Sequence, residues 1–280
     1  MMAPPNGQRS RLALITAILV AAFAIFPLYW AFVSALRPNE DIFKYLSPLS
    51  VWTFVPNRIT PANLTNVLSG PFGRAMLNSI GVSVATVVLG LLICTPAAFA
   101  LAKLNLPGRG AIFSIVILSF LIPFDAIAIP LSALFRGLGL ENTYLGIILP
   151  GIGNGFAVFL LRQFFLGVPS EIADAARLDG LNWFGIFLRI YLTLTRPALI
   201  SAGLILFVFQ WQAFLWPLLI APDPDYKVAA VAIADFAGEH STDFGAMFTG
   251  AIFVSSVPLI ILLAFQRYFT SSIAATGSQE

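Results

Sequence analysis

The sequence has few charged residues, one cysteine and one histidine. Charged side chains make up 10% of the 280 residues, whereas a typical globular domain has about 25%. Hydrophobic residues make up 59%, and phenylalanine alone contributes 26 residues. A soluble protein of this length needs more polar surface than this composition can supply. With a mean hydropathy of +0.90, the chain is therefore predicted to be an integral membrane protein.

The scarcity of reactive side chains excludes several kinds of site. Cys94 and His240 alone cannot form a disulfide framework or a Cys/His zinc site, so we expect no metal site and no catalytic residues. None of the lysines, Lys44, Lys103 and Lys227, follows a glycine or precedes a serine or threonine, which argues against a phosphate-binding P-loop. The net charge of +2 is too small for a nucleic-acid-binding protein.

Six apolar segments are long enough to cross a bilayer as helices. The first, residues 12–36, is too long to be the apolar part of a signal peptide, which has about 7–15 residues, so we expect it to be retained. The chain is therefore predicted to be an all-α polytopic membrane protein. The other five segments cover about residues 75–102, 110–135, 143–165, 197–221 and 244–268.

The basic residues in the short flanks predict the orientation. They favour a cytoplasmic N-terminus, because cytoplasmic loops carry the excess of lysine and arginine. Six spans then place both termini in the cytoplasm. The predicted organisation is a cytoplasmic N-terminus (1–11), a first transmembrane helix (12–36), an extracytoplasmic connection (37–74), a core domain of five helices (75–268) with a cytoplasmic loop (167–196), and a cytoplasmic tail (269–280).

The cytoplasmic loop contains a predicted helix of about two turns. Ser170 follows a proline and is a suitable N-cap, and Glu171 and Asp174 place negative charge near the positive end of the helix dipole. Gly180 supplies a left-handed stop. A second short helix is expected over residues 183–191, before the next span.

The composition of the loop helix favours a docking role. An amphipathic connector lying on the membrane is the alternative, but such a helix would carry lysine and arginine opposite large apolar residues. This helix has acids, and its small residues Ala173, Ala175 and Ala176 would let another protein approach closely. We therefore expect it to dock a soluble partner.

The same loop resembles the EAA loop of ABC importer permeases, in which Glu-Ala-Ala is followed by three residues and glycine. Residues 174–180 read Asp-Ala-Ala-Arg-Leu-Asp-Gly, with aspartate in place of glutamate. Asn78-Ser79, the segment 211–218 and the tail segment 266–269 are similar to the carbohydrate branch of this family. Gln212 stands where that branch usually has asparagine. The resemblance covers most of the chain, from Pro27 onward.

The resemblance implies the ABC type I importer permease fold, as in the shorter, six-helix permease of maltose or glycerol-phosphate importers. It implies a bacterial cytoplasmic membrane location and four kinds of partner: the bilayer, a second permease subunit, two copies of a cytoplasmic ABC ATPase that binds ATP and Mg, and an extracytoplasmic sugar-binding protein. This chain would bind no cofactor and would not be an enzyme. The residues implied to couple to the ATPase are Glu171, Asp174, Ala175, Ala176, Asp179 and Gly180.

Polar residues within the apolar segments are candidates for the translocation pathway, because burying them in a membrane is unfavourable. Glutamines beside tryptophans could provide the hydrogen bonds and the aromatic platform of a sugar site. Asp125 could instead lie near a helix end and reach water, and the glycine-rich segment 151–155 favours close helix packing or a kink. The candidates are Asp125, Asn154, Gln210, Trp211, Gln212 and Trp216.

Other functions remain open at this stage. A gradient-driven secondary transporter would be expected to show paired intramembrane ionisable groups or internal repeats, and the sequence offers only Asp125. A permease of an ABC importer for a solute other than a sugar would share the EAA-like loop. A membrane enzyme is less favoured, because no second catalytic residue accompanies Asp125.

Overall fold

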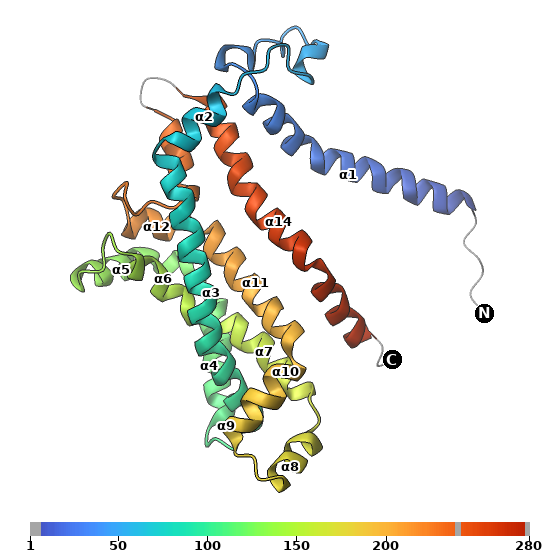
Figure 1. The fold of residues 1–280 in the computed structure, drawn as a ribbon, viewed down its shortest axis with the longest axis vertical. Coiled ribbons are helices and arrows are strands. Elements are labelled where there is room, and N and C mark those ends of the chain that lie inside the picture. The colour runs from blue at the N-terminus through green and yellow to red at the C-terminus, as the bar shows by residue number, and fades with distance from the viewer. Residues whose placement is uncertain (1–6, 239–241, 278–280) are drawn as a thin grey trace. The chain divides into compact units, whose positions relative to one another are not determined.

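The computed structural model describes residues 7–238 and 242–277, so His240 lies outside the described residues. Within these ranges the regular structure is helical, apart from one isolated β-bridge between Ala237 and Thr242 (Figure 1). The predicted all-α class is confirmed. The chain divides into two compact units, residues 1–73 with 233–256 and residues 74–232 with 257–280, which we describe in turn.

Four helical segments are each long and apolar enough to cross a membrane, and all four coincide with predicted spans. They follow from long runs of apolar residues, because only a helix satisfies its own backbone groups in lipid. These segments are α1 (Gly7–Ala35), α3 (Pro71–Lys103), α6 (Tyr144–Ile152) continued by α7 (Gly155–Gly167), and α14 (Phe244–Gly277).

The predicted span over residues 110–135 contains a sharp break. The chain forms α4 (Arg109–Leu121) and α5 (Phe124–Gly137), which meet at an angle of 94°. Pro123 lacks an N–H group and disfavours helical geometry at the residue before it, and Ile122 is accordingly extended, with φ −77° and ψ 120°. The proline therefore ends α4 and redirects the chain.

A second bent pair follows the predicted cytoplasmic loop. The short helices α9 (Trp183–Ile186), η3 (Phe187–Tyr191, a π-helical turn) and α10 (Leu192–Leu194) meet α11 (Arg196–Gln212) at 81°. If each bent pair is one span, the described residues contain six candidate spans, and otherwise four. The remaining short elements are η1 (Asn39–Asp41), η2 (Val51–Thr53), α2 (Ala62–Ser69), α8 (Ser170–Leu178), α12 (Leu215–Ile220), α13 (Ala229–Ala232) and η4 (Ile233–Phe236).

The first unit is organised around a buried arginine. Arg37, only 1% exposed, follows α1 and donates through Nη2 to the carbonyl oxygens of Trp52, Thr53 (3.0 Å) and Val55 (3.1 Å). Burial lowers the pKa of Arg37, and the Asp41 carboxylate opposes this shift, so the guanidinium remains a cation. The Arg37 side chain thus stabilises the connection between α1 and α2, which has little regular secondary structure.

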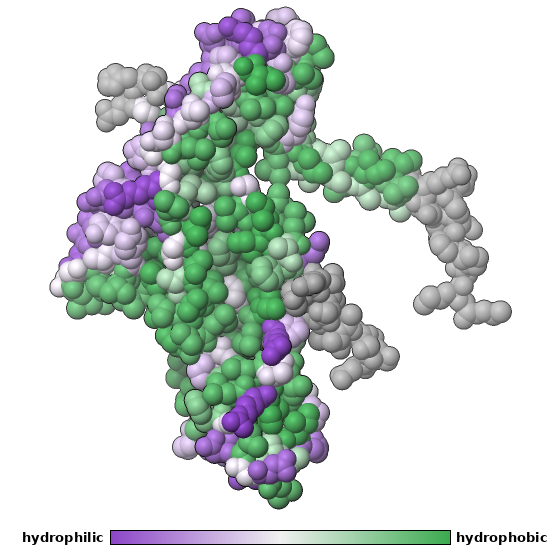
Figure 2. All heavy atoms as spheres, viewed as in Figure 1, coloured by the Kyte–Doolittle hydropathy of each residue, from purple (hydrophilic) through white to green (hydrophobic). Residues whose placement is uncertain are grey.

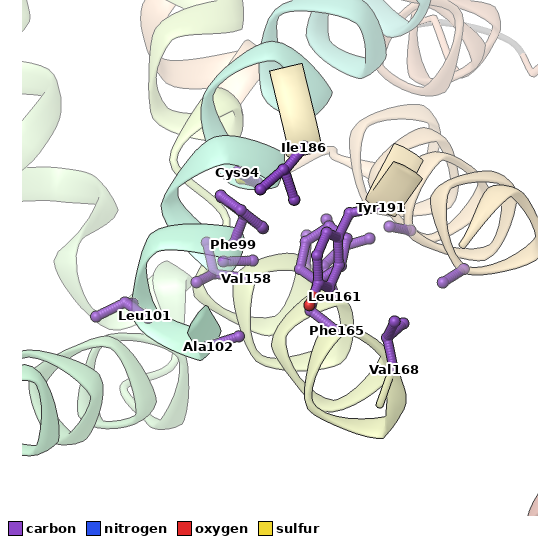
Figure 3. Packing of buried hydrophobic residues seen from close by; sticks show 14 of the residues in the cluster. Cys94, Phe99, Leu101, Ala102, Val158, Leu161, Phe165, Val168, Ile186 and Tyr191 are labelled. Carbon is purple, nitrogen blue, oxygen red and sulfur yellow. The ribbon is translucent and has the colours of Figure 1, made fainter. Parts of the chain in front are cut away.

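The second unit has a core of aromatic rings and small residues (Figure 3). The rings of Phe99 from α3, Phe165 from α7 and Tyr191 from η3 are in mutual contact, with centroids 5.0–5.9 Å apart. Ala198 and Ala202 bring α11 against the same cluster. Helices α3 and α7 are therefore joined at one point to the later, nearly consecutive elements η3 and α11.

Apolar surface is extensive, as expected of a chain that contacts lipid. Every side chain from residue 13 to residue 29 of α1 is exposed, and the visible side of this helix is covered by hydrophobic residues (Figure 2). Phe23 alone is 82% exposed. In water this surface would be unfavourable, so α1 is a lipid-facing or partner-facing helix.

The aromatic cluster yields a stability prediction. Phe165→Ala removes a ring with no exposed surface and should destabilise the protein by about 3–5 kcal/mol, because the cavity cannot be filled by rigid neighbours. The matched control is Phe23→Ala on the exposed face of α1. Thermal unfolding in detergent should show a marked loss of stability for the first variant and little for the second. Equal melting temperatures would contradict the assignment of the core.

Candidate functional site

The loop helix α8 begins one residue earlier than its sequence suggests. Ser170 was expected to cap the helix, but the capping position belongs to Pro169, with φ −55° and ψ 138°, and Ser170 is the first helical residue. No side chain among the described residues caps this end by a hydrogen bond. The correction follows from the proline, whose extended backbone already supplies the non-helical residue before the first turn.

The end of α8 agrees with the prediction. Gly180 has φ +84°, a left-handed conformation that glycine adopts without strain. The N–H of Leu181 donates to the carbonyl of Ala176 (3.0 Å), and that of Gly180 donates to the carbonyl of Arg177 (3.0 Å). These two bonds are those of a Schellman motif, which satisfies carbonyls left free at the helix end. The predicted stop at Gly180 is confirmed.

The two faces of α8 have different environments. Ala173 and Ala176 are 3% and 6% exposed and belong to the aromatic core cluster of the second unit. The prediction that these alanines face a partner is therefore wrong, because their methyl groups let α8 pack closely on its own chain. The outward face keeps the other candidates, Glu171, Asp174, Ala175 and Asp179, all of which are exposed, as is Gly180.

The sequence analysis missed Leu178. This side chain is 90% exposed at the last turn of α8, between Arg177 and Asp179. Ile172, on the same helix, is 38% exposed. A leucine this exposed on a short helix with charged residues suggests an interaction surface. The helical spacing of four residues between Asp174 and Leu178 could have shown that both lie on one face.

Further contacts fix α8 to the helices on either side. The Lys103 ammonium, at the end of α3, donates to the carbonyl of Val168 just before α8 (2.7 Å). After α8, Asn182 accepts a hydrogen bond from the N–H of Gly185 (2.8 Å) and so caps α9. The Arg177 guanidinium lies 5.4 Å from the centre of the Trp183 ring. The helix is therefore held at both ends and along one face.

A cavity of about 790 Å³ lies in the second unit where three helical connections break. The breaks are at Pro123 between α4 and α5, at Asn154 between α6 and α7, and at Ala213 and Phe214 between α11 and α12. Breaks of this kind expose backbone and polar side chains at membrane depth, as in other transporters. The cavity wall includes five of the six pathway candidates: Asp125, Asn154, Gln210, Gln212 and Trp216.

Trp211, the sixth candidate, does not line the cavity. Its ring is 3% exposed and stacks on Phe207 at 5.4 Å, inside the protein. Successive side chains of an α-helix differ by about 100° in direction, so Trp211 points away from Gln210 and into the protein. Gln212 is the last residue of α11 and lines the cavity at the helix break. The aromatic surface of the cavity comes instead from five phenylalanines that the sequence analysis did not single out: Phe120, Phe124, Phe156, Phe209 and Phe214.

Trp216 borders the cavity, but its indole N–H stabilises the protein through an internal hydrogen bond. Pro150 has no N–H, so the carbonyl of Gly146, four residues earlier, loses its helical partner. The indole N–H of Trp216 donates to this carbonyl (3.1 Å), and the ring packs edge-on against Phe124 and Phe135. Because its N–H already donates to the Gly146 carbonyl, Trp216 can contact a ligand only through part of its ring face.

Two of the three amide candidates, Asn154 and Gln210, are half-buried and already accept hydrogen bonds within the protein. Asn154 accepts a hydrogen bond from the N–H of Ala157 (2.9 Å) and so caps α7, and Gln210 accepts one from the hydroxyl of Thr86 (3.3 Å). A Cβ at Gly151 would lie 2.8 Å from Oε1 of Gln210, which agrees with the expected close packing of the glycine segment. Asp125 is exposed in the first turn of α5, where the helix dipole favours a carboxylate.

Asn78 and Ser79, which carry part of the family resemblance, hold a loop in place. Asn78 donates to the carbonyls of Asp225 and Lys227 (both 2.9 Å) and accepts from the Tyr144 hydroxyl (2.9 Å). Ser79 accepts from the N–H of Ala229 (2.8 Å). The pair thus fastens the connection after α12 to α3 and α6. This is a structural reason for an Asn-Ser pair at the start of α3.

Comparison with known proteins agrees with this architecture. The permease protein AraQ of the arabinooligosaccharides transport system of Halalkalibacterium halodurans is 33% identical over 261 residues, covering 92% of each chain. The permease protein UgpE of the sn-glycerol-3-phosphate transport system of Pectobacterium atrosepticum is 29% identical over 273 residues, covering 94% of each. These relatives confirm the resemblance to importer permeases, including the glycerol-phosphate type.

The same conclusion follows from a solved structure and a family match. A chain of a bacterial ABC transporter involved in the import of the acidic polysaccharide alginate superposes with a TM-score of 0.79 at 25% identity, covering 96% of this chain and 100% of that chain. Residues 90–275 match the family described as binding-protein-dependent transport system inner membrane component. The match covers two thirds of the chain, including α8 and every residue that lines the cavity except Thr86. The chain belongs to this family of inner membrane components and is an ABC importer permease.

Proposed function

We propose that this permease imports a neutral carbohydrate, in the size range of an oligosaccharide. The named relatives include a transporter of arabinooligosaccharides and one of a polysaccharide. A cavity of about 790 Å³ is within the range of about 300–1,000 Å³ that small-molecule sites occupy. Its amide groups can hydrogen-bond sugar hydroxyls, and its phenylalanine rings can pack against the apolar faces of sugar rings.

The charges in the cavity favour a neutral substrate over an anionic one. Among its described lining residues, Asp125 is charged and neither lysine nor arginine is present. A phosphate or carboxylate would lack a cationic partner and would be repelled by Asp125. The sn-glycerol-3-phosphate and alginate transported by relatives are therefore less suitable substrates for this cavity.

The proposed complex contains this chain, a second permease that forms the other half of the pathway, two ABC ATPase subunits and an extracytoplasmic binding protein. ATP and Mg would bind to the ATPase subunits, and the α8 region and both termini would lie in the cytoplasm. The outward face of α8, with Glu171, Asp174, Ala175, Leu178 and Asp179, would contact the ATPase. Acids would face basic or hydrogen-bonding groups, and Leu178 would enter an apolar pocket.

The observation that carries this proposal is the connection between α8 and the cavity. α7 runs from Asn154 at the cavity to the segment before α8, and α11 runs from the segment after α10 back to Gln212 at the cavity. Their lengths are about 20 Å and about 26 Å. Both helices pack on the cluster that holds Ala173 and Ala176. A displacement of α8 by the ATPase would therefore reach both cavity-lining breaks.

The ATPase contact is tested by Leu178→Ala in the full transporter. Removing most of a leucine that becomes buried at the contact should weaken ATPase binding by about tenfold, from roughly 1.4 kcal/mol of lost burial. Affinity purification from membranes in mild detergent would measure the recovered ATPase and second permease. The matched control is Leu138→Ala, 63% exposed at the end of α5. Equal ATPase recovery for both variants would contradict the docking role.

The purified transporter also distinguishes between the alternative functions, through the proteins recovered with it and the energy source of uptake. Recovery of a P-loop ATPase and uptake of a sugar only with ATP would support the importer. ATP-dependent uptake of another solute, with no response to sugars, would retain the importer and overturn its carbohydrate substrate. Uptake in liposomes by the chain alone, driven by an ion gradient, would contradict the whole proposal and favour a secondary transporter.

The cavity is tested by Gln212→Ala, with Gln163→Ala on an exposed face of α7 as the matched control. Losing one or two neutral hydrogen bonds to the sugar should raise the half-saturating concentration for uptake about two- to tenfold. Protein yield and ATPase recovery should not change. Asp125→Asn should behave similarly if its carboxylate contacts the sugar. Unchanged uptake kinetics in both cavity variants would mean that this cavity is not the sugar site.

A further inference from the structure

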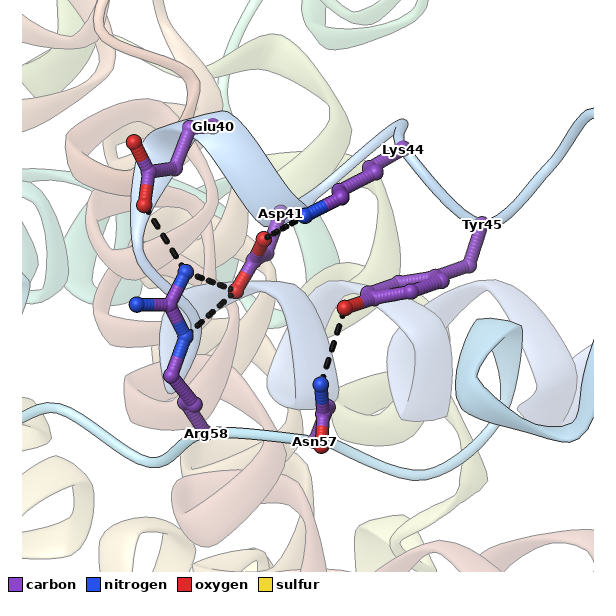
Figure 4. A network of polar contacts seen from close by, with 6 residues as sticks. All are labelled: Glu40, Asp41, Lys44, Tyr45, Asn57 and Arg58. Carbon is purple, nitrogen blue, oxygen red and sulfur yellow. Dashed lines mark hydrogen bonds and ion pairs between the residues drawn. The ribbon is translucent and has the colours of Figure 1, made fainter.

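Several amide side chains of this protein donate hydrogen bonds through their nitrogen. In the first unit, Asn57 donates to the hydroxyl of Tyr45 (2.8 Å; Figure 4), and in the second, Asn78 donates to two carbonyls of a loop. Asn154 and Gln210 at the cavity differ, because each uses its amide oxygen inside the protein instead. Their amide nitrogens make no hydrogen bond with the residues that the structure describes, so these nitrogens are available to a ligand.

The oxygen of the Gln210 amide is enclosed by two helices. Thr86 of α3, 1% exposed, donates a hydrogen bond from its hydroxyl to Oε1 of Gln210 (3.3 Å). From α6, a Cβ added at Gly151 would lie 2.8 Å from the same Oε1 and 2.9 Å from Cγ2 of Thr86, so only glycine leaves room for this approach. Gln210 lines the cavity, and because its oxygen is directed to α3 and α6, its nitrogen is the polar group left to face a ligand.

The Thr86 hydroxyl bonds across to another helix and not within its own. Hydroxyl side chains in helices often donate to the carbonyl four residues earlier, as Ser201 (3.0 Å) and Thr249 (2.7 Å) do here. Thr86 makes no such bond among the described residues, and a hydroxyl has one hydrogen to donate. That hydrogen is directed at Gln210, which indicates that Thr86 orients the glutamine.

Asn154 offers a second amide nitrogen at the break between α6 and α7. Its Oδ1 accepts from the N–H of Ala157 (2.9 Å) and caps α7, which fixes the amide with its oxygen toward the helix. An amide nitrogen carries two donors, so Asn154 and Gln210 together provide hydrogen-bond donors to the cavity. Asp125, on the cavity wall at α5, is an acceptor as a carboxylate. Donors and acceptor therefore come from different helices.

Donors of this kind require an acceptor atom on the ligand. The hydroxyl, ring and glycosidic oxygens of a neutral sugar all have lone pairs that can accept a hydrogen bond. An ammonium group has donors and no acceptor, so it would leave the two amide nitrogens unpaired in the site. An unsatisfied buried donor weakens binding, which favours oxygen over cationic nitrogen at this wall.

We propose that Thr86 is a positioning residue, which orients Gln210 so that its amide nitrogen, together with that of Asn154, binds acceptor oxygens of the substrate. This role rests on the proposed function, a neutral carbohydrate in this cavity. Thr86 acts through Gln210: without the hydroxyl, Oε1 would have no partner beside α3, and the amide would turn its oxygen to the cavity, where water can hydrate it. The cavity would then lose a donor at this point.

Uptake by the reconstituted transporter, with its partner subunits and binding protein, tests this role. The probes are radiolabelled neutral oligosaccharides, arabinotriose first. Thr86→Val removes the hydroxyl and keeps the shape of the side chain, whereas Thr86→Ser keeps the hydroxyl. Thr95→Val is the matched control, because Thr95 is also buried in α3 (4% exposed) and its hydroxyl has no partner among the described residues.

Thr86→Val should raise the half-saturating concentration for uptake about two- to tenfold, because one hydrogen bond to the sugar is lost, and should leave the maximal rate and the protein yield unchanged. Thr86→Ser should restore most of the wild-type value, and Thr95→Val should behave as the wild type. A serine variant as impaired as Thr86→Val would overturn the positioning role. Wild-type kinetics in Thr86→Val, while Gln212→Ala has an effect, would also overturn it and retain the cavity as the sugar site. Wild-type kinetics in Thr86→Val, Gln212→Ala and Asp125→Asn would overturn both.

Two further variants test how Thr86 acts and which group Gln210 offers. If Thr86 acts through Gln210, adding Thr86→Val to Gln210→Ala should cause no further increase, whereas additive increases would contradict the positioning role. Gln210→Glu keeps an oxygen for the Thr86 hydroxyl and replaces the amide nitrogen with an acceptor oxygen, so it should impair uptake at least as much as Gln210→Ala. Wild-type uptake by Gln210→Glu would show that the substrate donates at this point and would overturn the donor assignment. If the wild type takes up none of the oligosaccharides with ATP, the proposed function fails, and the role of Thr86 fails with it.

Discussion

The close packing of Ala173 and Ala176 on the aromatic core is the interaction on which the proposed coupling of this permease to an ATPase depends. A helix of nine residues is marginal on its own in water and needs a surface to pack against. Here that surface is formed by helices that continue to the cavity. Packed interiors transmit displacement because they contain little free space. The alanines thus join α8 to the hydrophobic core of the second unit, and its acids and Leu178 remain exposed for the proposed contact with the ATPase.

The cavity depends on a second constraint, the need to satisfy backbone groups where helices break within a membrane. Proline and glycine end the helices, and side chains replace the lost helical partners. Trp216 serves the carbonyl freed by Pro150, and Asn154 caps α7. The polar groups of the cavity are thus partly structural, which leaves Gln212 and Asp125, both exposed, as the side chains most available to a sugar.

The sequence was sufficient for the helical class, the main apolar segments and the glycine that ends α8, because these follow from local properties: hydrophobic length, charge and left-handed geometry. The sequence was insufficient where the orientation of a side chain depends on residues that pack against it from elsewhere in the chain. The inward face of α8 could not be chosen without knowing that α8 packs against the hydrophobic cluster that contains Phe165 and Tyr191. Trp211 looked like part of a sugar platform, but Phe207 holds it inside. The 94° bend at Pro123 has a local cause, since the proline marks the site, but the packing of α5 on α12 that accompanies it could not be predicted from the local sequence.

The most direct test of the account compares Ala176→Leu with Ala175→Leu in the assembled transporter. The measured quantities are the amount of ATPase that co-purifies and the number of sugar molecules taken up per ATP hydrolysed. Ala176→Leu overpacks the buried face, so ATPase recovery should stay normal while uptake per ATP falls. Ala175→Leu enlarges the exposed face and should reduce ATPase recovery instead. Normal uptake per ATP in Ala176→Leu, with the protein stably inserted, would contradict the claim that α8 acts through its packing on the core.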